Sequence, residues 1–141
     1  MYRYIKAMSD SRKEIRLQLK RQSGEITEHL IKLMLYPNAQ ERNHWKHEIY
    51  AFVHSVPKVK GINKFPSESF IFESLTIYLD NVPGLMWHVK REESDLVPED
   101  ANPNLVESIV QDYMEWLAKQ LSKYGTVESA DVFAKLDELT N

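Results

Sequence analysis

The feature that most constrains the fold is a long stretch of helical periodicity between Asn102 and Gly125. Apolar residues recur there at the 3.6-residue period for roughly five turns: Leu105, Ile109, Tyr113, Trp116, Leu117, Leu121 and Tyr124. Asn102 before Pro103 is typical of a helix start, because asparagine caps free amides and proline at the first position loses no hydrogen bond. Gly125 supplies the C-terminal stop. A helix of this kind predicts a core built from packed helices.

Proline and glycine divide the remaining sequence into further helical segments. Ser11 and Glu14 form a capping box, S-x-x-E, which predicts that a first helix begins near Arg12. Pro37 ends this helix. Both a break and a continuous helix are compatible with Gly24, because glycine costs only about 1 kcal/mol relative to alanine within a helix. The helical spacing continues after it in Ile26, Leu30, Leu33 and Met34.

Further helices are expected beyond the first. Asn38 can cap a second helix that runs to about Val56, and Ser67 after Pro66 opens a third. Apolar residues at mixed helical spacing mark this third helix as central: Phe70, Ile71, Phe72, Leu75, Tyr78 and Leu79. A short helix follows over residues 85–92.

A last helix is expected from about Val127 or Ser129, packed against the preceding helix because the joining turn is short. Its buried residues are expected to be Val132, Phe133, Leu136 and Leu139. We see no internal repeat and no alternating strand pattern. The sequence therefore predicts an all-α fold, a single-domain bundle of five or six helices over residues 1–141.

The charge of the chain is unevenly distributed. Residues 1–64 carry thirteen Lys/Arg against six Asp/Glu, whereas residues 65–141 carry five against fifteen, for a net charge of −3. We expect a basic loop near residues 57–66 and an acidic, more mobile loop near 92–102. Such polarity can attract a nucleic acid to the basic half or let two protomers meet, although charged helix faces can also simply cover a bundle.

Several classes of protein are disfavoured by what the sequence lacks. It has no cysteine, which excludes disulfides, thiolate metal sites and a thiol nucleophile. It has neither a long apolar run nor the apolar core of a signal peptide, so we expect a soluble, cytoplasmic protein. It also has no Gly-rich phosphate loop and no G-x-S-x-G elbow. We therefore predict that the protein is not an enzyme.

The stretch HWKHEIYAFVH, residues 44–54, raises the question of a metal site. On a helical wheel its histidines share the face opposite an expected core face of Trp45, Ile49, Phe52, Val53 and Val56. A zinc site needs three or four converging ligands, but one helix offers only two neighbours here, His44 and His47, with His54 two turns beyond. We therefore predict no metal site and no cofactor, and interpret these histidines as solvated or facing a partner.

A third ligand would have to come from elsewhere in the chain, and the candidates, which are His29, His88 or a carboxylate such as Glu48, have no diagnostic spacing. His29 lies beside Ile26 and Leu33, so we expect a partly buried, hydrogen-bonded core residue rather than a ligand. His88, next to an aromatic residue, admits both interpretations.

A candidate basic contact surface is formed by lysines and arginines of the first half: Arg12, Lys13, Arg16, Lys20, Arg21, Lys58, Lys60 and Lys64. These cations can pair with phosphates. No helix-turn-helix signature or aromatic RNA-binding motif accompanies them, and Glu14, Glu25 and Glu28 dilute the patch. The surface is equally suited to an acidic protein partner, which includes the acidic half of a second copy.

The segment ITEHLIKLMLYP, followed by Trp45, Ile49 and then PKVK, resembles the bacterial all-helical family known as domain of unknown function family twenty-nine. The likeness covers about residues 11–60. It implies a helical bundle, and because that family has no established activity it implies no catalytic residues.

Together these observations lead us to expect a binding protein without catalysis, which self-associates or docks to another protein. The alternatives are a nucleic-acid-binding protein that uses its basic half and a histidine-ligated metalloprotein.

Overall fold

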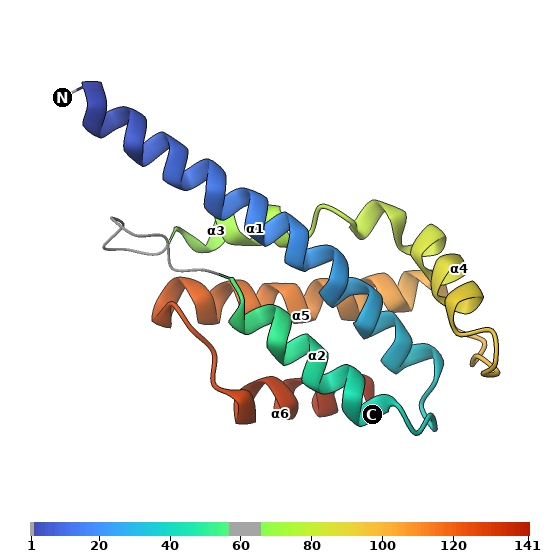
Figure 1. Ribbon diagram of the computed structural model, residues 1–141. Helices are drawn as coiled ribbons and strands as arrows, with labels where there is room; N and C mark the ends of the chain where they lie inside the picture. The colour runs from blue at the N-terminus through green and yellow to red at the C-terminus, as the bar shows by residue number, and fades with distance from the viewer. Residues whose placement is uncertain (1, 57–65) are drawn as a thin grey trace.

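The computed structural model describes residues 2–56 and 66–141 of the chain (Figure 1). Its elements are α1 (Tyr2–Leu35), α2 (Arg42–His54), α3 (Glu68–Leu75), the short 3₁₀ helix η1 (Leu79–Asn81), α4 (Val82–Glu92), α5 (Pro103–Tyr124) and α6 (Ser129–Thr140). These described ranges contain helices and no strand, so the predicted all-α bundle is confirmed. Nowhere in them does a helix combine the length and apolar character needed to span a bilayer. The expected basic loop, with Lys58, Lys60 and Lys64, lies outside the described residues.

Helices α1 and α5 organise the bundle. α1 crosses the other helices diagonally and contacts each of the other five, and its N-terminal turns extend past them (Figure 1). α5 lies beneath it and packs on α3, α4 and α6. The buried apolar side chains of all six helices form one cluster, in which α1 and α5 contribute the largest shares.

Helix α1 is longer than the sequence predicted, and the capping-box prediction is wrong. The helix begins at Tyr2, so Ser11 and Glu14 lie within it rather than at its start. A capping box is a purely local pattern, and the residues before it are themselves compatible with a helix. The helix also continues through Gly24, where an added Cβ would lie 3.3 Å from a ring carbon of Tyr78. Glycine at this position therefore lets that aromatic ring approach the helix closely.

The C-terminal turn of α1 is completed by groups from other segments. Pro37 follows the helix, as expected, and the Arg42 guanidinium donates to the carbonyl of Leu33. The amide of Glu99, in the connection between α4 and α5, donates to the Leu35 carbonyl at 2.7 Å. These donors satisfy carbonyls that a helix end leaves without an intrahelical partner.

Three other boundaries differ from the predictions. α2 begins at Arg42, not after Asn38, because residues 37–41 form tight turns, in which Ala39 donates to the Tyr36 carbonyl at 3.3 Å. α3 ends at Leu75, so that the expected core residues Tyr78 and Leu79 fall in a turn and in η1. α4 begins at Val82 rather than at residue 85. The predicted Ser67 cap is confirmed, since its hydroxyl accepts from the Phe70 amide.

The long helix α5 is confirmed, with Asn102 capping its start and Gly125 in the left-handed conformation at its end (φ 71°). Its predicted core face is only partly right, because Leu105 and Tyr124 are 59% and 57% exposed. The buried residues are Val106, Val110, Tyr113, Met114, Leu117, Ala118 and Leu121. Apolar residues cover more than one face of this helix, so periodicity alone cannot decide which of them the neighbouring helices bury.

Replacing Tyr113 with phenylalanine is expected to raise the free energy of unfolding by about 1 kcal/mol. The side chain is completely buried, its hydroxyl has no hydrogen-bond partner in the described part of the chain, and burial raises the pKa of the phenol well above its ordinary value. Removing a buried hydroxyl that has lost its water without gaining a partner relieves that cost. Urea denaturation measures the effect, and the exposed Tyr124→Phe is the control. A loss of stability in Tyr113→Phe would contradict the expectation.

Candidate functional site

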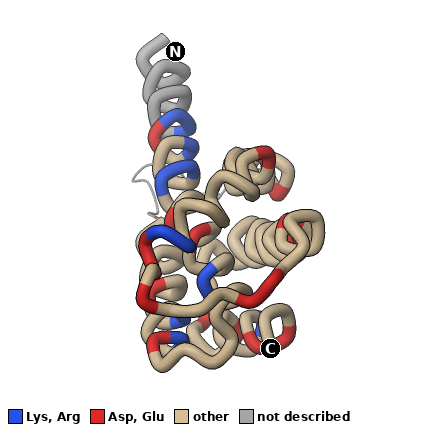
Figure 2. Tube along the Cα trace, turned by 90° about the vertical axis from the view of Figure 1, so that its right-hand side faces the viewer, with Lys and Arg blue, Asp and Glu red and all other residues tan. Residues whose placement is uncertain are grey.

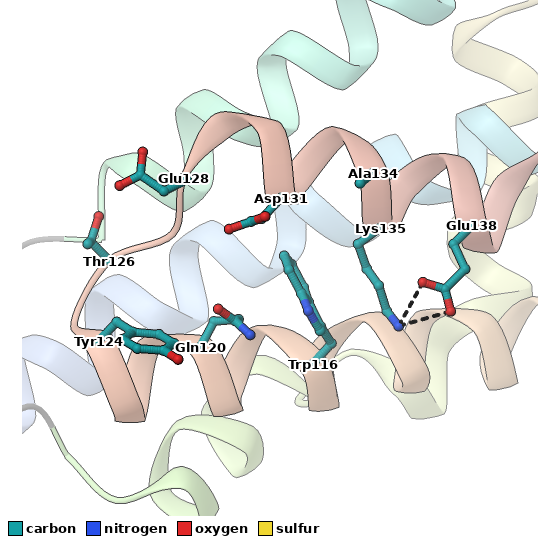
Figure 3. A pocket seen from close by; sticks show the side chains of 9 residues that line it. All are labelled: Trp116, Gln120, Tyr124, Thr126, Glu128, Asp131, Ala134, Lys135 and Glu138. Carbon is teal, nitrogen blue, oxygen red and sulfur yellow. Dashed lines mark hydrogen bonds and ion pairs between the residues drawn. The ribbon is translucent and has the colours of Figure 1, made fainter.

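A groove of about 650 Å³ lies between α5 and α6 (Figure 3). Because Gly125 ends α5 in the left-handed conformation, the chain turns there and α6 runs back alongside it (Figure 1). The groove is lined by Trp116, Gln120, Tyr124, Thr126, Glu128, Asp131, Ala134, Lys135 and Glu138. α5 contributes the aromatic rings, whereas α6 and the turn before it contribute the charged groups (Figure 3).

The groove carries a net negative charge beside its aromatic rings. Lys135 is the only cation among the described residues that line the groove, and its Nζ lies 3.2 Å from Oε2 of Glu138. Glu128 and Asp131 have no ion-pair partner among the described residues. Tyr124 already holds a cation near its face, since Lys123 Nζ lies 5.2 Å from the ring centroid. Carboxylates beside aromatic faces favour a ligand with a cationic head and an apolar stem, such as a lysine or arginine side chain.

The histidine face of α2 lies where the sequence predicted. His44, His47 and His54 are exposed, and Trp45, Ile49, Val53 and Val56 are buried on the opposite face, with Phe52 half-buried. The His47 ring lies 4.9 Å from the Phe133 ring of α6, and the His54 ring stacks on Tyr50. The three histidines therefore have separate neighbours and do not converge on one point.

His29 is the buried, hydrogen-bonded residue that the sequence predicted. It is 5% exposed, with Nδ1 2.7 Å from the Glu25 carbonyl oxygen and Nε2 in contact with Oε2 of Glu48. The other oxygen of Glu48 contacts Nε2 of His44. A carbonyl oxygen and a carboxylate oxygen both accept hydrogen bonds, so each ring nitrogen of His29 faces an acceptor. The Glu48 carboxylate thus joins α2 to α1.

On its other side, α1 meets α4 in a second charged cluster that sequence reasoning missed. His88 Nε2 lies 3.2 Å from Oε1 of Glu28 and 3.3 Å from Oε2 of Glu92. Lys32 Nζ lies 3.0 Å from Oε1 of Glu92 and 3.3 Å from Glu93. The only local signal is the four-residue spacing of His88 and Glu92, because Glu28 comes from a distant helix.

Two carboxyl groups of this cluster have opposite pKa shifts. Burial, followed by repulsion from Glu92, raises the pKa of Glu28. The hydrogen bond from Lys32 lowers the pKa of Glu92. Burial acts to lower the pKa of Lys32, but its contacts with Glu92 and Glu93 outweigh burial and raise it. The folded protein therefore favours a charged Glu92 and Lys32, and disfavours a charged Glu28.

The Lys32–Glu92 pair predicts an acid-sensitive contribution to stability. The pKa of Glu92 in the folded protein lies below its ordinary value of 4.5. The pair therefore stabilises the fold fully above pH 4.5, and this stabilisation is lost as the pH falls through the pKa of Glu92 in the folded protein. We expect Glu92→Gln to lower stability at neutral pH and to lose less further stability than the parent protein as the pH falls below 4.5. Urea midpoints across this range measure it. The exposed Glu138→Gln is the control, and an unchanged acid profile in Glu92→Gln would contradict the prediction.

The part of the predicted basic surface that the structure describes lies along α1 (Figure 2). Arg12, Lys13, Arg16 and Arg21 are exposed, and Lys20 is half-buried. The Arg12 and Arg16 guanidinium groups lie 6.0 and 4.8 Å from the centroid of the Phe70 ring of α3. A second stripe of the helix carries Lys13, Leu17 and Arg21 at four-residue spacing, with Leu17 54% exposed. This stripe therefore places an apolar side chain between two cations.

Comparisons with protein-family models, curated proteins and solved structures found no match for this chain. The resemblance of residues 11–60 to family twenty-nine therefore rests on the sequence motifs alone.

Proposed function

We propose that the protein self-associates, through insertion of the basic stripe of α1 from one copy into the α5–α6 groove of another, and that it has no catalysis of its own. The basic stripe is defined by Lys13, Leu17 and Arg21. The observation that carries the proposal is the match between this stripe and the groove in both charge and apolar character.

The charges of the two surfaces are complementary. The groove offers the carboxylates of Glu128 and Asp131, which have no ion-pair partner in the described ranges, and the stripe offers two exposed cations. Apolar contact is complementary as well, because the exposed Leu17 faces outward on the stripe and Trp116 and Tyr124 present rings in the groove. Aromatic residues of this kind commonly supply most of the binding energy of an interface.

The spacing of the charges is also compatible. Lys13 and Arg21 are separated by two helical turns, about 12 Å along the axis at 1.5 Å per residue. Asp131 is separated by about 10 Å by the same measure from Glu138, the carboxylate of α6 that Lys135 also engages. Lys13, Leu17 and Arg21 are all exposed, so this face of α1 is accessible to a second copy.

Light scattering on the intact protein tests the proposal. At micromolar concentration and low salt, we expect a mass above the 16.6 kDa of one chain, which falls toward that value as salt screens the contact. Arg21→Glu and Asp131→Lys should each yield monomers, because each places like charges in the contact. Mixing the two variants should restore the larger mass, since one contact is then unchanged and the other has its charges exchanged.

The matched control is Lys119→Glu, which changes the net charge as much as Arg21→Glu does but lies on α5 outside the groove. It should leave the mass unchanged. A monomeric parent protein at micromolar concentration would show the proposal to be wrong, and so would dimers that persist in both charge-reversal variants.

The accessible cations of α1 also favour a second candidate, a nucleic-acid-binding protein (Figure 2). If this candidate is right, the protein should retain DNA or RNA at low salt, and its affinity for the nucleic acid should fall steeply as the salt concentration rises. Asp131→Lys distinguishes the candidates, because it should weaken self-association and leave nucleic-acid binding intact. Absence of retention at low salt would eliminate this candidate.

A further inference from the structure

We propose that Glu28, His88 and Glu92 bind one divalent transition-metal ion of the Zn²⁺ class between α1 and α4. One imidazole nitrogen and two carboxylate oxygens, from these two helices, offer ligand atoms that all lie within 4.8 Å of one another. This site is separate from the α5–α6 groove and does not depend on self-association.

Two of the three distances between the ligand atoms match a tetrahedral shell, and all three lie within 4.8 Å. Zinc–nitrogen and zinc–oxygen bonds of about 2.0–2.1 Å place neighbouring ligand atoms about 3.3–3.4 Å apart. His88 Nε2 lies 3.2 Å from the Glu28 oxygen and 3.3 Å from the Glu92 oxygen. Small side-chain movements would therefore complete three ligand positions, and the side chain of His88 is 56% exposed, so that water can occupy the fourth.

The surrounding charge also favours a cation. Lys32 engages Glu92 through Oε1 and Glu93, which leaves Oε2 of Glu92 directed at His88. Glu28 has contact only with His88 among the described ion pairs. The carboxylates of Glu28 and Glu92 repel one another, and among the described residues Lys32 Nζ forms ion pairs only with Glu92 and Glu93. A divalent ion bound between Glu28 and Glu92 would place positive charge beside both carboxylates.

The ligand types select the class of metal. Imidazole with carboxylates suits zinc and neighbouring transition metals, whereas calcium takes six to eight oxygen ligands and magnesium keeps most of its water. A metal bound here would link α1 to α4. It would thus stabilise the folded state without requiring any chemistry of its own.

Isothermal titration of tag-free protein with ZnCl₂ tests the site, together with Co²⁺ titration followed by visible absorption. We expect one equivalent of zinc, four-coordinate cobalt bands, and a rise in the thermal midpoint with zinc. His88→Ala and Glu28→Gln should each weaken binding by at least about tenfold and abolish the zinc-induced rise. The control, His44→Ala with His47→Ala, removes exposed histidines of α2 and should bind zinc as the parent does.

Glu28→Gln separates metal binding from simple structural damage. In metal-free buffer it should unfold cooperatively near the thermal midpoint of the parent, because glutamine keeps the size of the side chain and only the contact with His88 is changed. Zinc should then stabilise the parent and not the variant. The proposal is overturned if the parent binds no zinc saturably, if His88→Ala or Glu28→Gln binds it as well as the parent does, or if the α2 control loses it.

Discussion

Replacing Leu117 with alanine is expected to lower the free energy of unfolding by about 3 kcal/mol, a loss typical of fully buried leucines. Leu117 is 0% exposed and lies on the buried face of α5, the helix that packs on α1, α3, α4 and α6. The substitution removes apolar contacts and leaves a cavity that the surrounding helices can fill only in part. Urea denaturation followed by circular dichroism measures the change in midpoint.

The matched control is Leu105→Ala on the same helix. Leu105 is 59% exposed, so the same chemical change should alter stability by less than about 0.5 kcal/mol. The pair also tests which face of α5 is buried. If Leu105→Ala cost as much as Leu117→Ala, the assignment of that face would be wrong.

Replacing His29 with alanine is expected to cost about 2–3 kcal/mol, since it removes two hydrogen bonds, one of them to a carboxylate, and leaves a cavity. The imidazole is 5% exposed and joins Glu25 on its own helix to Glu48 on α2. The edge of its ring also packs against Phe52. Glu48 is 35% exposed, so water can reach its carboxylate in the variant. The loss of stability is therefore smaller than for breaking a fully buried ion pair.

His44→Ala is the control for His29→Ala, because both histidines contact the same Glu48 carboxylate. His44 is 70% exposed, and removal of an exposed ion pair should cost less than about 0.5 kcal/mol. Chemical denaturation of both variants at neutral pH gives the comparison. Equal costs would mean that burial of His29 does not determine the strength of this contact.

Sequence reasoning predicted the elements well where local chemistry decides the outcome. The start of α5 at Asn102, its end at Gly125 and the Ser67 cap follow from side-chain and backbone preferences of single residues. It failed where a local pattern did not decide the outcome, because the capping-box residue Ser11 lies inside α1 and not at its start. It also failed where packing chooses among apolar residues, as with Leu105 on the surface of α5.

The candidate sites could be predicted only in part. The exposed histidines of α2 and the buried His29 follow from helical periodicity and local composition. The α5–α6 groove does not, because Trp116 fits the core pattern of its own helix, and the charged groups of the groove come from α6 and the turn before it. The contact of Glu28 with His88 is likewise tertiary, and no sequence spacing encodes it.

The hydrogen bond from the Glu99 amide to the Leu35 carbonyl has a kinetic consequence. This amide belongs to a connection between helices, so its proton is shielded from deuterated solvent only while that connection stays docked on α1. Its exchange rate therefore reports the opening of α1 relative to the segment between α4 and α5. Exchange as slow as that of the central α5 amides would mean that these parts separate only when the whole bundle unfolds.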